Sequence, residues 1–150
     1  PLATDLRVIV SVSSVMIDLE RMGDHAEGIA RITITMQDEP LVKPLIDLPI
    51  MAAKARDMLR NAVEAFVDAD PEKAYAVNAA DDEVDAIYDR VYEELIGIMV
   101  ADPQTIIPST HLQCVSQYIE RIADRATNIA ERAVYSATGI YPRDMNVSNY

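Results

Sequence analysis

Eight prolines restrict the fold of this 150-residue chain more than any other sequence feature. Proline breaks the interior of a helix, so each one marks a helix end or a connection. Four long proline-free stretches remain, and the sequence predicts helices over about 4–37, 50–67 and 72–101 and in the stretch that follows Pro108-Ser109. A composition with 20 alanines and only 4 glycines supports the same all-α interpretation, because alanine has the highest helix propensity.

Apolar side chains recur along these stretches with the three- and four-residue spacing of a packed helix. The last stretch shows this spacing most clearly, at Leu112, Val115, Ile119, Ile122, Ala126, Ile129 and Ala133. Short connections, of about 4 to 13 residues, favour antiparallel packing of consecutive helices. We therefore expect an all-α, up-down helical bundle.

The chain carries a formal net charge of −12, from 13 basic and 25 acidic residues. Such a chain repels phosphate backbones, so we expect no nucleic-acid binding. Its longest strongly apolar run, over 8–17, is about half the length of a membrane-spanning helix, so we expect no membrane insertion. A single cysteine, Cys114, and the absence of a signal segment fit a cytoplasmic protein.

The first and last helical stretches repeat one another at an offset of 100 residues. Glu20-Arg21 aligns with Glu120-Arg121, and seven of the 21 positions from 11 to 31 are identical to their counterparts. We interpret this as a duplicated unit that ends in the repeated helix. The second unit has two helices before its repeated helix, so we expect about two helices upstream of the first one.

Without upstream helices, the first stretch presents an apolar face to solvent. This face consists of Val12, Val15, Leu19, Met22 and Ile29. Leaving it in water is unfavourable, at about 25 cal/mol per Å² of apolar surface. We therefore expect the face to pack against a second copy of the chain, giving a homodimer.

Oxygen-bearing side chains also recur at helical spacing, in two stripes that lie away from the apolar seams. The stripes are formed by Asp81, Asp85 and Asp89 and by Glu120, Asp124, Asn128 and Glu131. If the third and fourth helices are neighbours, both stripes flank one groove, and such ligands suit hard cations, iron or manganese. The alternative is a solvated acidic face balanced by Arg121, Arg125 and Arg132, and the spacing alone leaves both interpretations open.

Three segments together resemble the PhoU family of phosphate-uptake regulators: PLATDLR at 1–7, LERMGDHA at 19–26 and YIERIADRATNIAE at 118–131. The resemblance implies two tandem three-helix bundles, each ending in a helix with an E-R-x-x-D motif. On this basis the chain is an N-terminally truncated member, with the last helix of the first bundle at 1–37 and a linker at 38–49. The complete second bundle then covers 50–140, and 141–150 form a tail.

The resemblance also implies a metal site on the bundle surface. Its cofactor would be iron or zinc, with a multinuclear cluster as one form and manganese or magnesium as second choices. Carried over position by position, the second-bundle ligands are Asp81, Asp85, Glu120 and Asp124, with Asn128 nearby. In the first bundle only Glu20 and Asp24 match the motif.

The role that the resemblance implies is regulation without catalysis. The family represses the phosphate-starvation response by coupling a phosphate-specific ABC transporter to a membrane sensor histidine kinase. The alternatives are a metal-independent helical adaptor and a PhoU-like domain of a larger phosphate transporter. A di-iron enzyme is disfavoured, because its Glu-x-x-His pairs are replaced here by Met22 before His25 and Pro108 before His111. The sequence shows no glycine-rich phosphate loop either.

Overall fold

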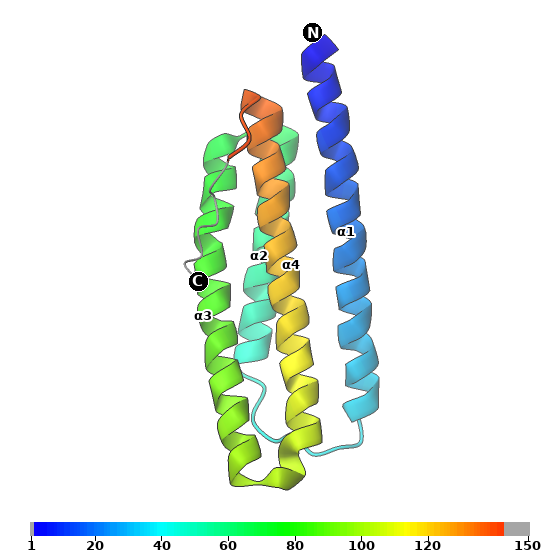
Figure 1. The fold of residues 1–150 in the computed structure, drawn as a ribbon, viewed down its shortest axis with the longest axis vertical. Helices are drawn as coiled ribbons and strands as arrows, with labels where there is room; N and C mark the ends of the chain where they lie inside the picture. The colour runs from blue at the N-terminus through cyan, green and yellow to red at the C-terminus, as the bar shows by residue number, and fades with distance from the viewer. Residues whose placement is uncertain (1, 143–150) are drawn as a thin grey trace.

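The computed structural model describes residues 2–142, which form an all-α bundle. Its elements, in chain order, are α1 (Leu2–Met36), α2 (Asp47–Asp68), α3 (Pro71–Ala101), a short 3₁₀ turn (Pro103–Thr105) and α4 (Ile106–Thr138). Successive helices run up and down the long axis (Figure 1). The predicted fold class and the number of long helices are therefore confirmed for the described part of the chain.

Prolines sit at helix starts more often than the sequence analysis expected. Pro49 and Pro108 lie inside the first turns of α2 and α4, so both helices begin a few residues earlier than predicted. The first turn tolerates proline because its N–H groups have no partner inside the helix. Pro71 opens α3 directly after Asp70, whose carboxylate accepts a hydrogen bond from the Lys73 backbone N–H at 3.1 Å.

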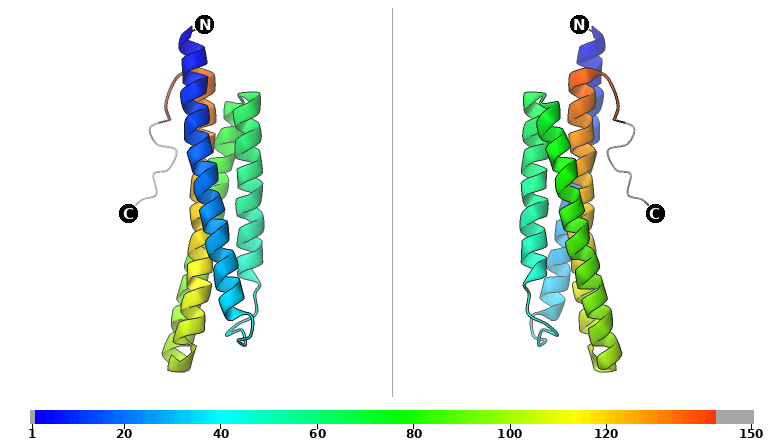
Figure 2. Two further views of the ribbon diagram at one scale, coloured as in Figure 1. Left: turned by 90° about the vertical axis from the view of Figure 1, so that its right-hand side faces the viewer. Right: turned by 90° about the vertical axis from the view of Figure 1, so that its left-hand side faces the viewer.

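Helix α4 lies at the centre of the molecule. It packs against all three other helices, whereas α1 packs against α4 alone. In Figure 1, α4 separates α1 from the α2–α3 pair, and the side views in Figure 2 show α1 running antiparallel along α4. The expectation that all consecutive helices pack together is wrong for α1 and α2, because the connection over 37–46 carries the chain past α4.

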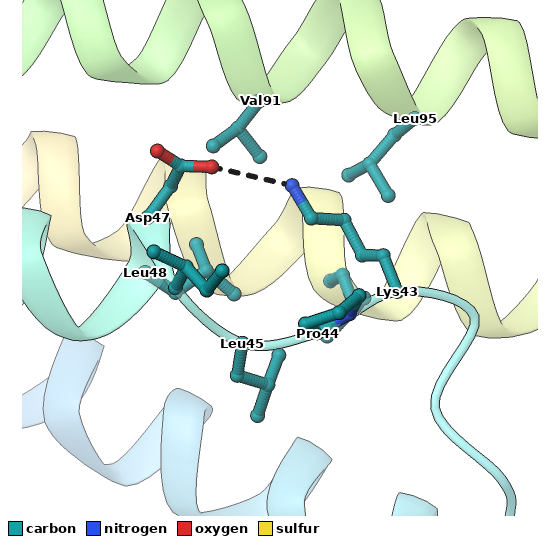
Figure 3. Close-up of a pocket in the computed structure, with 9 residues that line it drawn as sticks. Lys43, Pro44, Leu45, Asp47, Leu48, Val91 and Leu95 are labelled. Atoms are coloured by element: carbon teal, nitrogen blue, oxygen red, sulfur yellow. Dashed lines mark hydrogen bonds and ion pairs between the residues drawn. The ribbon is translucent and has the colours of Figure 1, made fainter.

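The connection between α1 and α2 is fixed at one end of the bundle by Lys43. Its ammonium group lies 3.4 Å from Asp47 and also pairs with Glu94 of α3, while its side chain is only 10% exposed. Together with Val91 and Leu95, it closes a cavity of about 10 Å³ (Figure 3). That volume holds about one water molecule, so the feature is structural and not a ligand site.

Helix α1 is only partly covered by α4. Val15 and Met22 of the predicted apolar face are buried and Ile29 is partly buried, but Val12 and Leu19 remain exposed. Further exposed apolar side chains on the helix are Leu2, Leu6, Ile9, Met16, Ile17 and Ile34. The single-helix contact therefore leaves a large part of the apolar surface of α1 in solvent.

Across residues 2–142, no helix combines the length and the apolar character that a membrane span requires.

Candidate metal centre between α3 and α4

The antiparallel helices α3 and α4 bring four predicted carboxylates together: Asp81 and Asp85 from α3, and Glu120 and Asp124 from α4. We call these four residues the carboxylate cluster. The negative charges of Asp85, Glu120 and Asp124 all act on Asp81, and Asp124 acts on both Asp85 and Glu120. The four residues of the two predicted stripes are therefore near enough for their charges to interact, and their assignment as a metal site stays a prediction.

The cluster is more buried than the sequence analysis expected. Asp81 is only 5% exposed, Asp85 and Glu120 are half-buried, and Asp124 is exposed. The interpretation of this stripe as lying off the packed surface is therefore wrong for Asp81. The physical reason is the central position of α4, which brings α3 against the side of α4 that carries Glu120 and Asp124.

Burial and mutual repulsion make the cluster costly to ionise. The pKa of Asp81 is raised to about 7. Burial is the largest cause of this rise, and the negative charges of Asp85, Asp124 and Glu120 add to it. Burial also raises the pKa of Glu120 to about 7, with smaller contributions from Asp124 and Asp85. Two carboxyl groups therefore titrate close to neutral pH instead of near pH 4.

The other two carboxyl groups shift in the same direction. Partial desolvation raises the pKa of Asp85, and the neighbouring negative charge of Asp124 adds to the effect. Desolvation between the helices likewise raises the pKa of the Asp124 carboxyl, although Arg125 and Arg121 oppose the rise. The local charge therefore favours protonation or the approach of a cation at every member of the cluster.

The donor set of the cluster fits a metal ion. Among residues 2–142, no cation forms an ion pair with any of its four carboxylates, and Asp81 Oδ1 is buried without a hydrogen-bond partner. Carboxylate oxygens bind iron, manganese and zinc. In the side-chain positions described for residues 2–142, however, no three His, Cys, Asp or Glu side chains already converge on one point.

Asn78 is a candidate ligand that the sequence analysis missed. It precedes Asp81 by three residues and Asp85 by seven, so it continues the acidic stripe of α3 by one turn. Its side-chain oxygen and nitrogen are both buried without a hydrogen-bond partner. Its spacing of three residues before Asp81 is the sequence signal that indicates this position.

The remaining predicted ligands lie elsewhere. Asn128 lines a groove between α4 and α1, together with Ser14, Asp18 and Arg125, so the structure does not bring it to the carboxylate cluster. Asn128 lies on the side of α4 that faces α1, which explains why it is not near the carboxylates of α3. Glu20 and Asp24 are exposed on α1.

The repeated residues of α1 instead meet α4 through aromatic packing. His25 is half-buried and stacks on Tyr118 with 5.6 Å between ring centroids. Gly28 faces the same ring, and a Cβ at this position would lie 2.7 Å from Tyr118 Cε2. The first copy of the repeat has glycine at this position, where the second copy has Asn128. The Tyr118 ring occupies the space that a side chain at position 28 would need.

Comparison with known proteins agrees with this arrangement. A profile of the PhoU domain matches residues 1–33 and 48–133. The chain is 38% identical over 144 residues to a phosphate-specific transport system accessory protein PhoU homolog from Rhizobium meliloti, covering 95% of this chain and 61% of that protein. It thus spans about six tenths of the length of this curated relative.

Two solved structures share the fold. The crystal structure of PhoU from Pseudomonas aeruginosa superimposes with a TM-score of 0.88 at 33% identity, over 93% of this chain and 68% of that one. The phosphate transport system regulatory protein PhoU from Streptococcus pneumoniae gives a TM-score of 0.86 at 33% identity, over 94% and 67%. With its helices superimposed on these structures and most of its length matched by the domain profile, the chain belongs to the PhoU family.

Proposed function

We propose that this protein regulates phosphate uptake without catalysing a reaction. The names of its relatives support the first part, since they describe an accessory or regulatory protein of a phosphate transport system. In the proposed role the protein acts in the cytoplasm, couples a phosphate-specific ABC transporter to a membrane sensor histidine kinase, and represses the phosphate-starvation response. The transporter components and the kinase are then its partners.

We further propose that the carboxylate cluster holds iron or zinc. The observation that carries this proposal is the set of four neighbouring carboxylates with raised pKa values and no cationic partner among the described residues. A bound cation would replace the repulsion between these groups with attraction and would link α3 to α4. Asp81, Asp85, Glu120 and Asp124 would hold the metal, and the side-chain oxygen of Asn78 lies one turn away.

Metal content after exhaustive dialysis, measured by plasma mass spectrometry, tests the cluster. We expect stoichiometric iron or zinc in the protein and none in a variant with alanine at Asp81, Asp85, Glu120 and Asp124. A matched control with alanine at Asp38, Glu39, Asp68 and Glu93 loses the same charge at exposed positions and should keep its metal. Absence of metal after reconstitution, or equal loss in both variants, contradicts the metal assignment.

The regulatory role has a separate readout. In cells that lack the native gene, we expect this chain to restore repression of a phosphate-starvation reporter in phosphate-rich medium. If the quadruple cluster variant folds, loses its metal and still represses, a metal-independent helical adaptor is the better description. If the chain restores no repression even when joined to the part of a relative that it does not align with, the regulatory proposal itself is contradicted.

We also propose that two copies associate through α1. The support is the exposed apolar surface that α4 leaves uncovered, including Leu6, Ile9 and Met16. Light scattering at micromolar concentration should give the mass of a dimer, and replacing these three residues with serine should give the monomer. A monodisperse monomer of the unmodified chain contradicts the proposal.

A further inference from the structure

A polar groove lies between α4 and α1. It has a volume of about 300 Å³ and is lined by Ser14, Ile17, Asp18, Arg125, Asn128, Arg132 and Tyr141. On α4, Arg125, Asn128 and Arg132 follow one another at spacings of three and four residues, which places them on one face. We call this feature the arginine groove.

The groove concentrates positive charge in a chain whose net charge is −12. Among residues 2–142, Arg132 forms no ion pair, and its guanidinium lies over the Tyr141 ring at 5.0 Å from the centroid. Stacking of this kind fixes the plane of a guanidinium and leaves its N–H groups free to donate. The Tyr141 hydroxyl donates to Glu131 at 3.2 Å, which ties the ring to α4.

The second arginine is only lightly held. Arg125 Nη1 lies 3.4 Å from Asp18 Oδ1, a long contact that leaves the other guanidinium N–H groups available. The Asp18 side chain is 12% exposed and that of Arg125 is 29% exposed, so both are shielded from water. Asn128 adds a half-buried amide that can donate to the same space.

From this arrangement we infer that the arginine groove binds a protonated tetrahedral oxyanion, namely inorganic phosphate. Planar guanidinium groups match the oxygen spacing of such ions and donate two hydrogen bonds at once. The groove is larger than one such ion, so its size alone does not select the free ion over a phosphate monoester.

Asp18 gives the groove its selectivity. A buried carboxylate repels a fully ionised anion, but it accepts a hydrogen bond from an oxyanion that still carries a proton. Inorganic phosphate keeps a proton near neutral pH, whereas sulfate has none and a phosphate monoester loses its last proton at about pH 6. The pairing of one carboxylate with two arginines therefore favours phosphate over sulfate, although the two ions have the same shape.

Calorimetric titration of the full chain, dialysed against a chelator, tests the inference. The probes are inorganic phosphate, phenyl phosphate and sulfate. We expect saturable binding of inorganic phosphate near neutral pH, with phenyl phosphate and sulfate bound more weakly by about tenfold or more. Tighter binding of phenyl phosphate than of inorganic phosphate would show that Asp18 does not select a protonated ligand, and it overturns the inference. Equal binding of sulfate, or no saturable heat with any probe at millimolar concentration, overturns the inference.

Two variants separate ligand binding from folding. Arg132→Gln should weaken phosphate binding by about tenfold to a hundredfold, whereas Arg60→Gln, which removes the same charge at an exposed position of α2, should leave it unchanged. Asp18→Asn should raise the affinity for sulfate to that for phosphate, a gain that damage to the fold cannot produce. Unchanged phosphate binding in Arg132→Gln, or unchanged selectivity in Asp18→Asn, contradicts the assignment.

The test is independent of the proposed function. Arg132→Gln leaves the carboxylate cluster intact, so its metal content should match that of the unmodified protein. Loss of phosphate binding with metal retained isolates the arginine groove, and loss of metal in the cluster variant with phosphate binding retained isolates the carboxylate cluster.

Discussion

The two sides of α4 carry opposite chemistry within a few residues of sequence. Asp124 contributes to the carboxylate cluster on the α3 side, whereas the next residue, Arg125, lines the arginine groove on the α1 side. A rotation of about 100° per residue is enough to separate them. One central helix thus places acidic side chains toward α3 and arginines toward α1, and a net charge of −12 reveals neither arrangement.

The two sides also differ in how well their charges are compensated. On the α1 side, Asp18 already opposes the two arginines. On the α3 side, four carboxylates face one another without a paired cation among the described residues. Unpaired negative charge therefore destabilises the packing of α3 on α4 more than that of α1 on α4, and this difference can be tested.

The largest expected effect is on the pH dependence of stability in metal-free protein. Asp81 and Glu120 keep protons up to about pH 7 in the folded state. Unfolded carboxyls release theirs near pH 4, so the folded state binds more protons between these values and stability falls as pH rises through this window. Asp81 alone should account for about 2–4 kcal/mol of the loss. Urea unfolding with chelator at about pH 5 and about pH 8 measures it, and stability that rises across this range contradicts the comparison.

A single substitution should remove part of that loss. Asp81→Asn eliminates the most buried carboxyl, so we expect stabilisation of about 1–3 kcal/mol at pH 8 in chelator. The difference should disappear near pH 5, where the native carboxyl is protonated. Glu93→Gln, an exposed position on the same helix, serves as the control and should change stability by less than about 0.5 kcal/mol. Destabilisation by Asp81→Asn at pH 8 would show that the carboxylate has a partner there.

The contact between α1 and α4 can be disturbed by one methyl group. Gly28→Ala places a Cβ against the Tyr118 ring, so we expect a net loss of about 1–2 kcal/mol despite the better helix propensity of alanine. Gly23→Ala on the same helix has no atom within 4 Å of the new Cβ and should gain about 0.5–1 kcal/mol. Thermal unfolding of both variants measures the difference. Equal stabilisation by both substitutions would mean that the Tyr118 ring moves aside freely.

Much of the fold could be predicted from the sequence, because prolines and apolar spacing are local signals. The number of long helices and the proximity of acids on α3 to acids on α4 followed from those signals, whereas the starts of α2 and α4 did not, because Pro49 and Pro108 lie inside their first turns. The burial of Asp81 did not, because it depends on α4 being surrounded by three helices, and no local pattern reports how many neighbours a helix has.

The arginine groove was also beyond sequence reasoning. Its residues come from α1, from α4 and from Tyr141 beyond the end of α4, and Asp18 and Arg125 are 107 positions apart. The sequence pattern indicates only that the arginines of α4 balance the charge of the acidic stripe. The domain boundaries stay predictions, and most of the predicted tail at 141–150 lies outside the described residues, which end at 142.

The smallest expected effect is the coupling between Asp18 and Arg125. Both side chains are partly shielded and their contact is long, so a double-mutant cycle of Asp18→Asn and Arg125→Gln should give about 0.5–1 kcal/mol. The two single variants should nevertheless differ in their pH dependence. Desolvation raises the pKa of Asp124 and the positive charge of Arg125 opposes that rise, so Arg125→Gln should increase the loss of stability between about pH 5 and about pH 8, and Asp18→Asn should not. An equal increase of this loss in both variants would show that Asp18 affects the carboxylate cluster as strongly as Arg125 does. The description of the cluster and the groove as separate sites would then be wrong.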